Sequence, residues 1–184
     1  AAKTDEGEQI KGVFYYDGAD QDKIKHKLDL YLPKGLKDYP VLFFVHGGAW
    51  VMGDKDQFGV YGTFAGAFAK LGIGVVVTNY RLSPAVKHPE HVKDVARAFA
   101  WTRKNIAGQG GDPDRIIVRG NSAGGHLATL LVTDECYLDD PALALDAGCR
   151  KSICAVVSLS GVYRVPEEQE FRAMSLSIID NLVG

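Results

Sequence analysis

Short apolar runs and segments of helical periodicity alternate along the chain after residue 25. Residues 26–32 alternate polar and apolar side chains, with Leu28, Leu30 and Leu32 on one side, which predicts a half-buried strand. Residues 41–45 are wholly apolar, as is typical of a strand covered on both faces. Further apolar runs predict strands at 73–78, 116–119 and 153–159.

The segments between these runs predict helices at 59–70, 91–105 and 122–133. In the second of them Asp94 falls on the polar side, so we expect it to be exposed. Glycines and a proline at 108–113 end that helix. Strands and helices in this order predict one α/β domain over residues 1–184, a three-layer sandwich with a mostly parallel sheet.

The last fifty residues carry weaker signals. Residues 133–152 are acidic and then basic, which indicates a surface connection. Residues 167–182 are compatible with a helix, and we expect 162–184 to begin a cap or inserted segment. The three cysteines form no C-x-x-C pair. They are read as free thiols or, for Cys136 and Cys149, as a disulfide that needs an oxidising compartment.

Charge and hydropathy narrow the classes of partner. The chain has 184 residues, 46% of them hydrophobic, and a formal net charge of -2. This balance gives no electrostatic attraction for nucleic acid, and no apolar run approaches the roughly 20 residues that cross a bilayer. We therefore expect neither a nucleic-acid partner nor a membrane span. The chain starts at Ala1 without a methionine, so localisation stays open between the cytoplasm and export.

A serine lies between a predicted strand and a predicted helix. Residues 120–124, Gly-Asn-Ser-Ala-Gly, fit the pattern G-x-S-x-G. In the strand–turn–helix setting this pattern predicts a sharp, strained turn that presents Ser122 as a nucleophile. Side chains at Gly120 or Gly124 would collide with the strand or the next turn. The alternative is an ordinary N-cap serine in a glycine-rich helix start.

A second motif, His46-Gly47-Gly48-Ala49-Trp50, directly follows the buried run at 41–45. Such a loop supplies backbone N–H groups to the oxyanion that forms during acyl transfer. We expect the donors to be Gly48, Ala49 and Ala123, with Gly47 needed for the turn. His46 is interpreted as a structural residue bonded within the loop, and Trp50 as either a pocket wall or a packing residue.

Several motifs in order resemble the hormone-sensitive-lipase-like carboxylesterases of the α/β-hydrolase superfamily. They are the two motifs above together with Gly53, residues 80–84 (Tyr-Arg-Leu-Ser-Pro), 111–113 (Gly-Asp-Pro) and Gly125. The resemblance implies a serine hydrolase of short-chain carboxylic esters with a Ser-Asp-His triad and no cofactor or metal. The chain departs from the family pattern at Ala49, where a third glycine is usual, and at Asn121. The His-Gly-Gly-x-Trp loop also resembles that of kynurenine formamidases.

The triad acid and histidine are missing after Ser122. His126 is the only downstream histidine, and one helical turn on it would point along the helix rather than act as the base. His88 and His91 are expected at the surface. The downstream acids follow no recognisable strand and are expected to be solvated; they are Asp134, Asp139, Asp140, Asp146 and Asp180.

We therefore expect a C-terminal segment of the same parent protein, in one chain or as a docked fragment, to supply the acid, the histidine and two more strands. The run at 153–159 agrees, because an uncovered apolar edge without Lys or Pro would promote aggregation. Three hypotheses stay open: an esterase acting on a small ester, an amidase or formamidase, and a binding protein that has lost catalysis. Trp50 and Tyr163 are candidates for the substrate pocket.

Overall fold

The computed structural model describes residues 7–163. Residues 1–6 and 164–184 lie outside the described residues. The predicted helix at 167–182, and nearly all of the segment expected to begin a cap, fall in the range after residue 163. Both therefore stay predictions.

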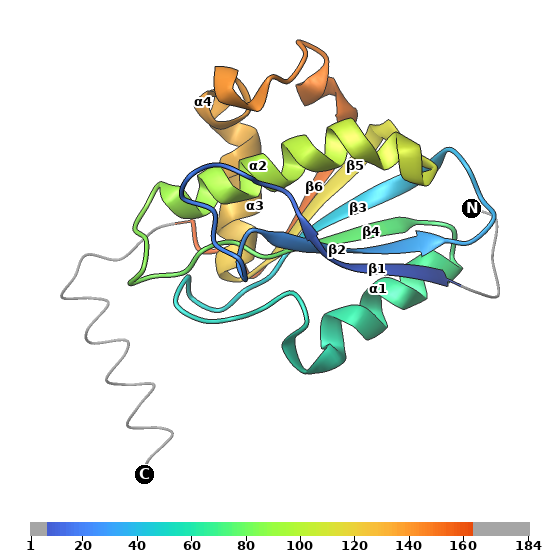
Figure 1. Ribbon diagram of the computed structural model, residues 1–184, viewed down its shortest axis with the longest axis horizontal. Coiled ribbons are helices and arrows are strands. Elements are labelled where there is room, and N and C mark those ends of the chain that lie inside the picture. Colours follow the sequence, from blue (N-terminus) through green and yellow to red (C-terminus); the bar gives the residue numbers. More distant parts are fainter. Residues whose placement is uncertain (1–6, 164–184) are drawn as a thin grey trace.

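Six strands form one twisted sheet in the order β1-β2-β4-β3-β5-β6 (Figure 1). Strands β4, β3, β5 and β6 run parallel, whereas β1 and β2 are antiparallel to their neighbours. This mostly parallel sheet confirms the predicted α/β class. The strands are β1 (Gly7–Phe14), β2 (Lys27–Pro33), β3 (Tyr39–Val45), β4 (Gly74–Thr78), β5 (Gly111–Asn121) and β6 (Ile153–Leu159).

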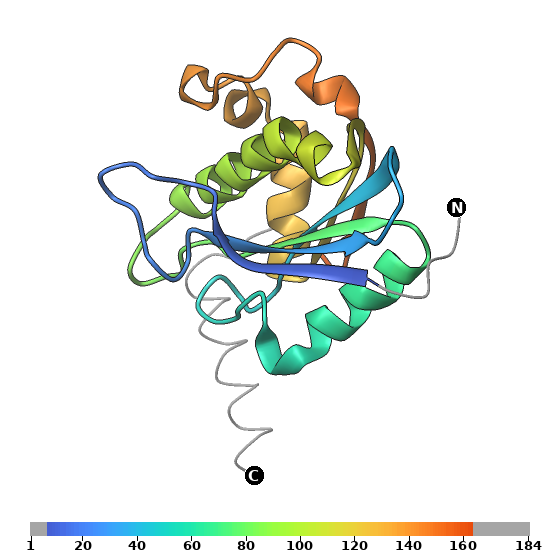
Figure 2. The same ribbon diagram turned by 45° about the vertical axis from the view of Figure 1, so that its right-hand side comes forward.

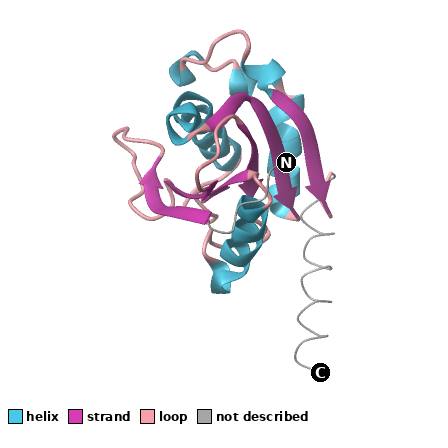
Figure 3. Ribbon diagram, turned by 90° about the vertical axis from the view of Figure 1, so that its right-hand side faces the viewer, coloured by secondary structure: helices cyan, strands magenta, loops and turns pink. Residues whose placement is uncertain are grey.

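Helices cover both faces of the sheet. Helix α1 (Val60–Lys70) packs on one face, and α2 (Glu90–Asn105) and α3 (Ala123–Thr133) pack on the other (Figures 2 and 3). The side chains of β3 alternate accordingly. Phe43 joins the core beneath α2 and α3, and Phe44 joins the core beneath α1. A wholly apolar strand is required because both of its faces are buried.

Three parts of the fold differ from the prediction. Strand β1 gave no signal because most of its side chains are exposed at the edge of the sheet. Strand β2 is buried on both faces rather than one, since Tyr31 packs under α1 and Asp29 pairs with Lys55 at 2.9 Å. The 108–113 break is a short 3₁₀ turn, η2 (Ile106–Gln109), after which Gly111–Pro113 already belong to β5.

The segment at 133–152 is more than a surface connection. It holds the short helix α4 (Glu135–Leu138) and the 3₁₀ turns η3 (Pro141–Leu143) and η4 (Cys149–Ser152). A further 3₁₀ turn, η1 (Gln57–Gly59), precedes α1. Tyr137, Leu138 and Leu143 are buried against the core of α2 and α3, so apolar side chains anchor this segment. The three cysteines are free thiols, with Cys149 buried and the others exposed.

Asp94 is fully buried, contrary to the prediction. The connection between β1 and β2 places His26 Nε2 at 3.0 Å from Asp94 Oδ1. Arg81 donates to both carboxylate oxygens, at 2.8 and 2.9 Å, and Arg97 donates to Oδ1 at 2.8 Å. Burial favours the protonated acid, but His26 and Arg81 outweigh it and lower the pKa of Asp94 to about 2.

We expect Asp94→Asn to lower the free energy of unfolding by about 3–5 kcal/mol, because it leaves buried cationic groups without their counter-charge. Urea unfolding followed by circular dichroism measures the loss. Asp20→Asn is the matched control: Asp20 binds Arg81 at 2.9 Å, but its side chain is 53% exposed. That variant should lose less than about 1 kcal/mol. Equal losses in the two variants would contradict the buried role.

Strand β6 is an edge of the sheet within the described residues, since it pairs with β5 and with no other described strand. Val156, Val157 and Leu159 are 38%, 39% and 41% exposed. The edge therefore presents apolar side chains next to open backbone groups, as the sequence predicted. None of the helices in residues 7–163 combines the length and apolar character needed to span a membrane.

Candidate active site

Ser122 stands in the one-residue turn between β5, which ends at Asn121, and α3, which begins at Ala123. Its backbone angles are φ 53° and ψ -121°, a conformation that L-residues avoid. The Ser122 N–H donates to the Leu159 carbonyl at 2.8 Å, and the Ser122 carbonyl accepts from the His126 N–H at 3.1 Å. Strand β6 and helix α3 thus hold the strained turn that the motif predicted.

The glycines on either side of Ser122 are required for close packing. A Cβ atom at Gly120 would lie 2.0 Å from the Gly124 carbonyl oxygen. A Cβ atom at Gly124 would lie 2.2 Å from the Val45 carbonyl oxygen and 2.4 Å from that of His46. All three distances are far below van der Waals contact, so the predicted collisions are confirmed. The contacts of Gly124 with the Val45 and His46 carbonyl oxygens also show that α3 begins directly against the end of β3.

The glycine-rich loop after β3 lies against this turn. A Cβ atom at Gly47 would be 2.8 Å from the Asn121 carbonyl oxygen and 3.3 Å from Ser122 Cβ. Gly47 is therefore needed for close approach rather than for a positive φ. The positive φ values fall on the next three residues, Gly48 (120°), Ala49 (50°) and Trp50 (61°). The two motifs, more than seventy residues apart in sequence, meet at the carboxyl ends of β3 and β5.

The expected oxyanion donors are free to donate hydrogen bonds to a ligand. Within residues 7–163, the N–H groups of Gly48, Ala49 and Ala123 have no hydrogen-bond acceptor. Ala123 opens α3, so its N–H has no partner inside the helix and lies at the positive end of the helix dipole. Ser122 itself is partly exposed and its side chain caps no backbone group. Free donors beside a free hydroxyl can stabilise a negative oxygen formed at that hydroxyl.

His46 is buried inside the loop. Its Nδ1 lies 2.7 Å from the Gly47 carbonyl oxygen, and its ring stacks on Tyr80 with centroids 4.5 Å apart. A Cβ at Gly53 would come within 2.6 Å of Nδ1, so the chain closes tightly over the ring. Burial lowers the pKa of His46 from 6.5 to about 4, and the Gly47 carbonyl only partly offsets this. The ring is therefore neutral at pH 7 and bonded within the loop, as the sequence indicated.

We expect His46 to make folding pH-dependent. Its pKa is lower in the folded than in the unfolded chain, so the unfolded state binds the proton first as the pH falls below 6.5. Stability is then lost between pH 6.5 and about 4, by at most about 3 kcal/mol. His46→Asn removes the titrating ring and keeps a side-chain N–H donor. The free energy of unfolding of the wild type should fall more steeply between pH 7 and pH 4 than that of this variant; parallel curves would contradict the prediction.

The other histidines near the site differ in burial. His88 is exposed, as expected, but His91 is only 4% exposed and its Nε2 lies 3.1 Å from Ser83 Oγ. His126 is half-buried with its ring edge-on to Trp50, the centroids 5.3 Å apart. Its Nδ1 is buried and has no hydrogen-bond partner, and no described imidazole is bonded to the Ser122 hydroxyl. The prediction of a surface position was thus correct for His88 and wrong for His91.

The downstream acids lie in the segment after α3, away from Ser122 at the opposite end of that helix. Asp134 and Asp140 cap α4 and η3, Asp139 pairs with Arg150, and Asp146 accepts from the Gly148 N–H. Asp180 lies outside the described residues. The described part of the chain therefore brings Ser122 and the expected oxyanion donors together and places no acid–histidine pair beside them.

A cavity of about 500 Å³ adjoins the site. Ala49 and Trp50 line it from the glycine-rich loop, and His126, Leu127 and Leu130 line it from α3. Tyr163, the other pocket candidate, is 68% exposed and is not among its lining residues. Sequence reasoning did not find the contribution of Ser83 and Lys87 to this cavity. A signal for Lys87 was its place in a polar, histidine-rich run, residues 87–91, just before the predicted helix at 91–105.

Known proteins share this sequence pattern. The family model BD-FAE matches residues 28–175. Esterase LipQ of Mycobacterium tuberculosis is 37% identical over 147 residues, which cover 78% of this chain and 33% of the relative. Versiconal hemiacetal acetate esterase of Dothistroma septosporum is 32% identical over 167 residues, which cover 90% of this chain and 48% of the relative.

Solved structures give the same picture. A thermophilic esterase from the planctomycete Thermogutta terrifontis superposes with a TM-score of 0.66 at 26% identity, over 85% of this chain and 54% of that one. The carboxylesterase EstE1, cloned from a metagenomic library, superposes with a TM-score of 0.63 at 25% identity, over 91% of this chain and 51% of its own. This chain thus spans between a third and about half of the length of the relatives it matches.

Proposed function

Because the chain belongs to the BD-FAE family of hormone-sensitive-lipase-like α/β-hydrolases, we propose that its parent protein is a serine carboxylesterase that cleaves short-chain carboxylic esters through an acyl-enzyme. Relatives named as esterases support the reaction class. The observation that supports the proposal is the close approach of Gly47 to the Ser122 turn, which puts a serine hydroxyl and free backbone donors next to each other.

In the proposed first step, Ser122 Oγ bonds to the ester carbonyl carbon while the hydroxyl proton passes to a histidine. The carbonyl π electrons move to the oxygen, which becomes negative. The N–H groups of Gly48, Ala49 and Ala123 then donate to this oxygen. Each such donor is worth roughly 3–4 kcal/mol in the transition state, because it is aimed before the charge develops.

Collapse of the tetrahedral intermediate completes the acylation. The alcohol leaves with the proton held by the histidine, and an ester bond joins the acyl group to Ser122 Oγ. The same histidine then takes a proton from water, which attacks the acyl-enzyme. The carboxylic acid departs and Ser122 regains its proton.

We further propose that the histidine and its acid partner come from a C-terminal segment of the parent protein that pairs with β6. The open, apolar β6 edge supports this, and so do relatives two to three times longer than the matched region. Residues 1–184 alone should then fail to hydrolyse 4-nitrophenyl acetate, and the complete protein should succeed. Equal turnover by the two, with a single 19.9 kDa species in the first sample, would contradict the proposal.

The nucleophile is tested by labelling the complete protein with a fluorophosphonate and mapping the adduct by peptide mass spectrometry. We expect the adduct on Ser122. An inert Ser122 would favour the binding-protein hypothesis instead. Side-by-side assays on 4-nitrophenyl acetate and N-formylkynurenine separate esterase from formamidase, because both reactions use the same nucleophile and oxyanion donors.

A further inference from the structure

The cavity beside the candidate site has apolar walls and a basic rim. Its volume of about 500 Å³ is in the range that binds small molecules. Ala49, Trp50, Leu127 and Leu130 supply apolar surface. The remaining lining residues are polar or basic: Ser83, Lys87, His88, His91 and His126.

The cavity is connected to the reacting centre through two segments. Ala49, whose N–H is one of the free donors, lines it from the glycine-rich loop. His126 lines it from α3, and the His126 N–H donates to the Ser122 carbonyl at 3.1 Å. A group held in the cavity therefore lies beside one expected oxyanion donor residue, Ala49, and beside the helical turn that follows Ser122. One arm of a bound ester fits this place.

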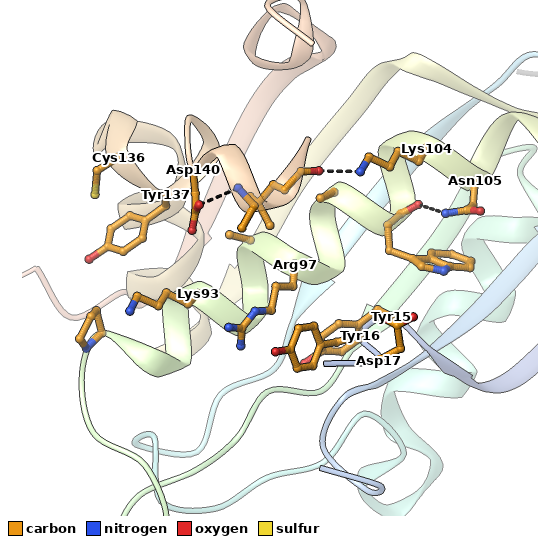
Figure 4. Close-up of a pocket in the computed structure, with 16 residues that line it drawn as sticks. Tyr15, Tyr16, Asp17, Lys93, Arg97, Lys104, Asn105, Cys136, Tyr137 and Asp140 are labelled. Atoms are coloured by element: carbon orange, nitrogen blue, oxygen red, sulfur yellow. Dashed lines mark hydrogen bonds between the residues drawn. The ribbon is translucent and has the colours of Figure 1, made fainter. Parts of the chain in front are cut away.

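The charge of this cavity sets it apart from two other cavities in the described residues. No Asp or Glu is among its described lining residues. By contrast, the cavity along α2 in Figure 4 mixes Lys93, Arg97 and Lys104 with Asp17 and Asp140. Its cations already have partners: Glu90 for Lys93, Asp94 for Arg97 and the Leu143 carbonyl for Lys104. The third cavity, near β1, contains Asp54, which pairs with Lys25.

One positively charged side chain at the site cavity is available to a ligand. Lys87 is exposed and forms no ion pair within residues 7–163. His126 Nδ1 is buried and without a hydrogen-bond partner. His91 Nε2 lies 3.1 Å from Ser83 Oγ, and Ser83 in turn donates to the Val86 carbonyl at 3.0 Å, so the imidazole is the donor of that pair. Burial lowers the pKa of both His91 and His126, so both rings are neutral at pH 7 and the positive charge of the cavity comes from Lys87.

We propose that this cavity selects esters with one arm that is apolar next to the ester group and ends in a carboxylate. The apolar walls take the chain, and Lys87 takes the anionic end. Charge-assisted hydrogen bonds to a carboxylate are stronger than neutral ones, which gives the preference its physical basis. The inference rests on the proposed ester hydrolysis at Ser122.

Two matched substrate pairs test the preference in the complete protein. The acyl pair is mono-4-nitrophenyl glutarate against 4-nitrophenyl pentanoate, and the alcohol pair is 4-(acetoxymethyl)benzoate against benzyl acetate. We expect kcat/KM to be roughly tenfold or more higher for the anionic member of at least one pair. Neutral members that are equal or better in both pairs would overturn the inference.

The variant Lys87→Gln tests the contribution of the positive charge at this position. It should remove most of the preference for the anionic member, because it takes away the positive charge that lines the cavity. Lys93→Gln is the matched control, because Lys93 is another lysine of the same region but pairs with Glu90 at 2.9 Å and lines the Figure 4 cavity. Equal loss of preference in both variants would point to general surface charge and overturn the assignment.

A binding measurement separates this inference from the proposed function. In Ser122→Ala protein, glutarate should shift the histidine Cε1–H NMR signals, and 1-pentanol at the same concentration should not. Turnover of neutral and anionic esters alike, with no glutarate shift, would overturn the inference and leave the esterase proposal standing. A glutarate shift without turnover of any ester in wild-type protein would support the anion site and refute the esterase proposal.

Discussion

Replacing Ser122 by alanine should lower kcat for 4-nitrophenyl acetate by roughly 10⁵-fold in the complete protein. In the proposed mechanism the hydroxyl forms the acyl bond, and the free N–H donors cannot replace it. Only the residual rate that oxyanion binding provides should survive. The fold should persist, because the Ser122 side chain caps no backbone group and is only partly buried. Initial-rate kinetics and thermal unfolding of the same samples measure both quantities.

Ser158→Ala is the control for loss of a nearby hydroxyl. Ser158 lies on β6 and packs so closely on α3 that a Cβ at Gly125 would come 2.6 Å from its Oγ. The Ser158→Ala protein should keep a turnover within a few-fold of wild type, because Ser158 Oγ packs against α3 and does not face the donors of the glycine-rich loop. If Ser122→Ala retained more than about a tenth of the wild-type rate, Ser122 would not be the nucleophile.

The sequence predicted the Ser122 turn well because its determinants are local and steric. The turn requires glycine at positions 120 and 124, because Gly120 and Gly124 each make a backbone contact that any side chain would block. The helices and strands of the core could be predicted for the same reason, because hydrophobic periodicity is a property of one segment of the chain. The pairing of the glycine-rich loop with this turn was expected from the arrangement that the two motifs have in α/β-hydrolases, not from the local sequence.

Asp94 and His91 were misjudged because their burial is decided by other segments. The polar side of α2 is covered by residues of the β1–β2 connection, among them His26, and by Arg81 from the loop after β4. Helical periodicity shows which side of a helix is polar, but it does not show which distant side chains will cover and bond the polar groups on that side. The cavity next to the candidate site was not predicted for a related reason: Lys87 and Leu130 come together only through the tertiary fold.

The close approach of α3 to the end of β3 leads to the second large effect. We expect Gly124→Ala to lower kcat/KM by roughly 10²-fold and the free energy of unfolding by about 3 kcal/mol. The new Cβ would lie 2.2 Å from the Val45 carbonyl oxygen and 2.4 Å from that of His46, and backbone atoms cannot rotate away as side chains do. Either α3 or the start of the glycine-rich loop must move. Each movement separates Ser122 from the donors of Gly48 and Ala49.

Gly66→Ala is the matched control, because Gly66 is also a helical glycine but has no atom within 4 Å of an added Cβ. Alanine favours a helix over glycine by about 1 kcal/mol, so this variant should be as stable as wild type or more so, with unchanged kinetics. The contrast removes helix propensity as an explanation, since the same exchange is made in both helices. Steady-state kinetics and urea unfolding provide the two readouts. A Gly124→Ala protein that matched Gly66→Ala in both would show that the first turn of α3 is not wedged against the end of β3, and the geometric basis of the proposed site would fail with it.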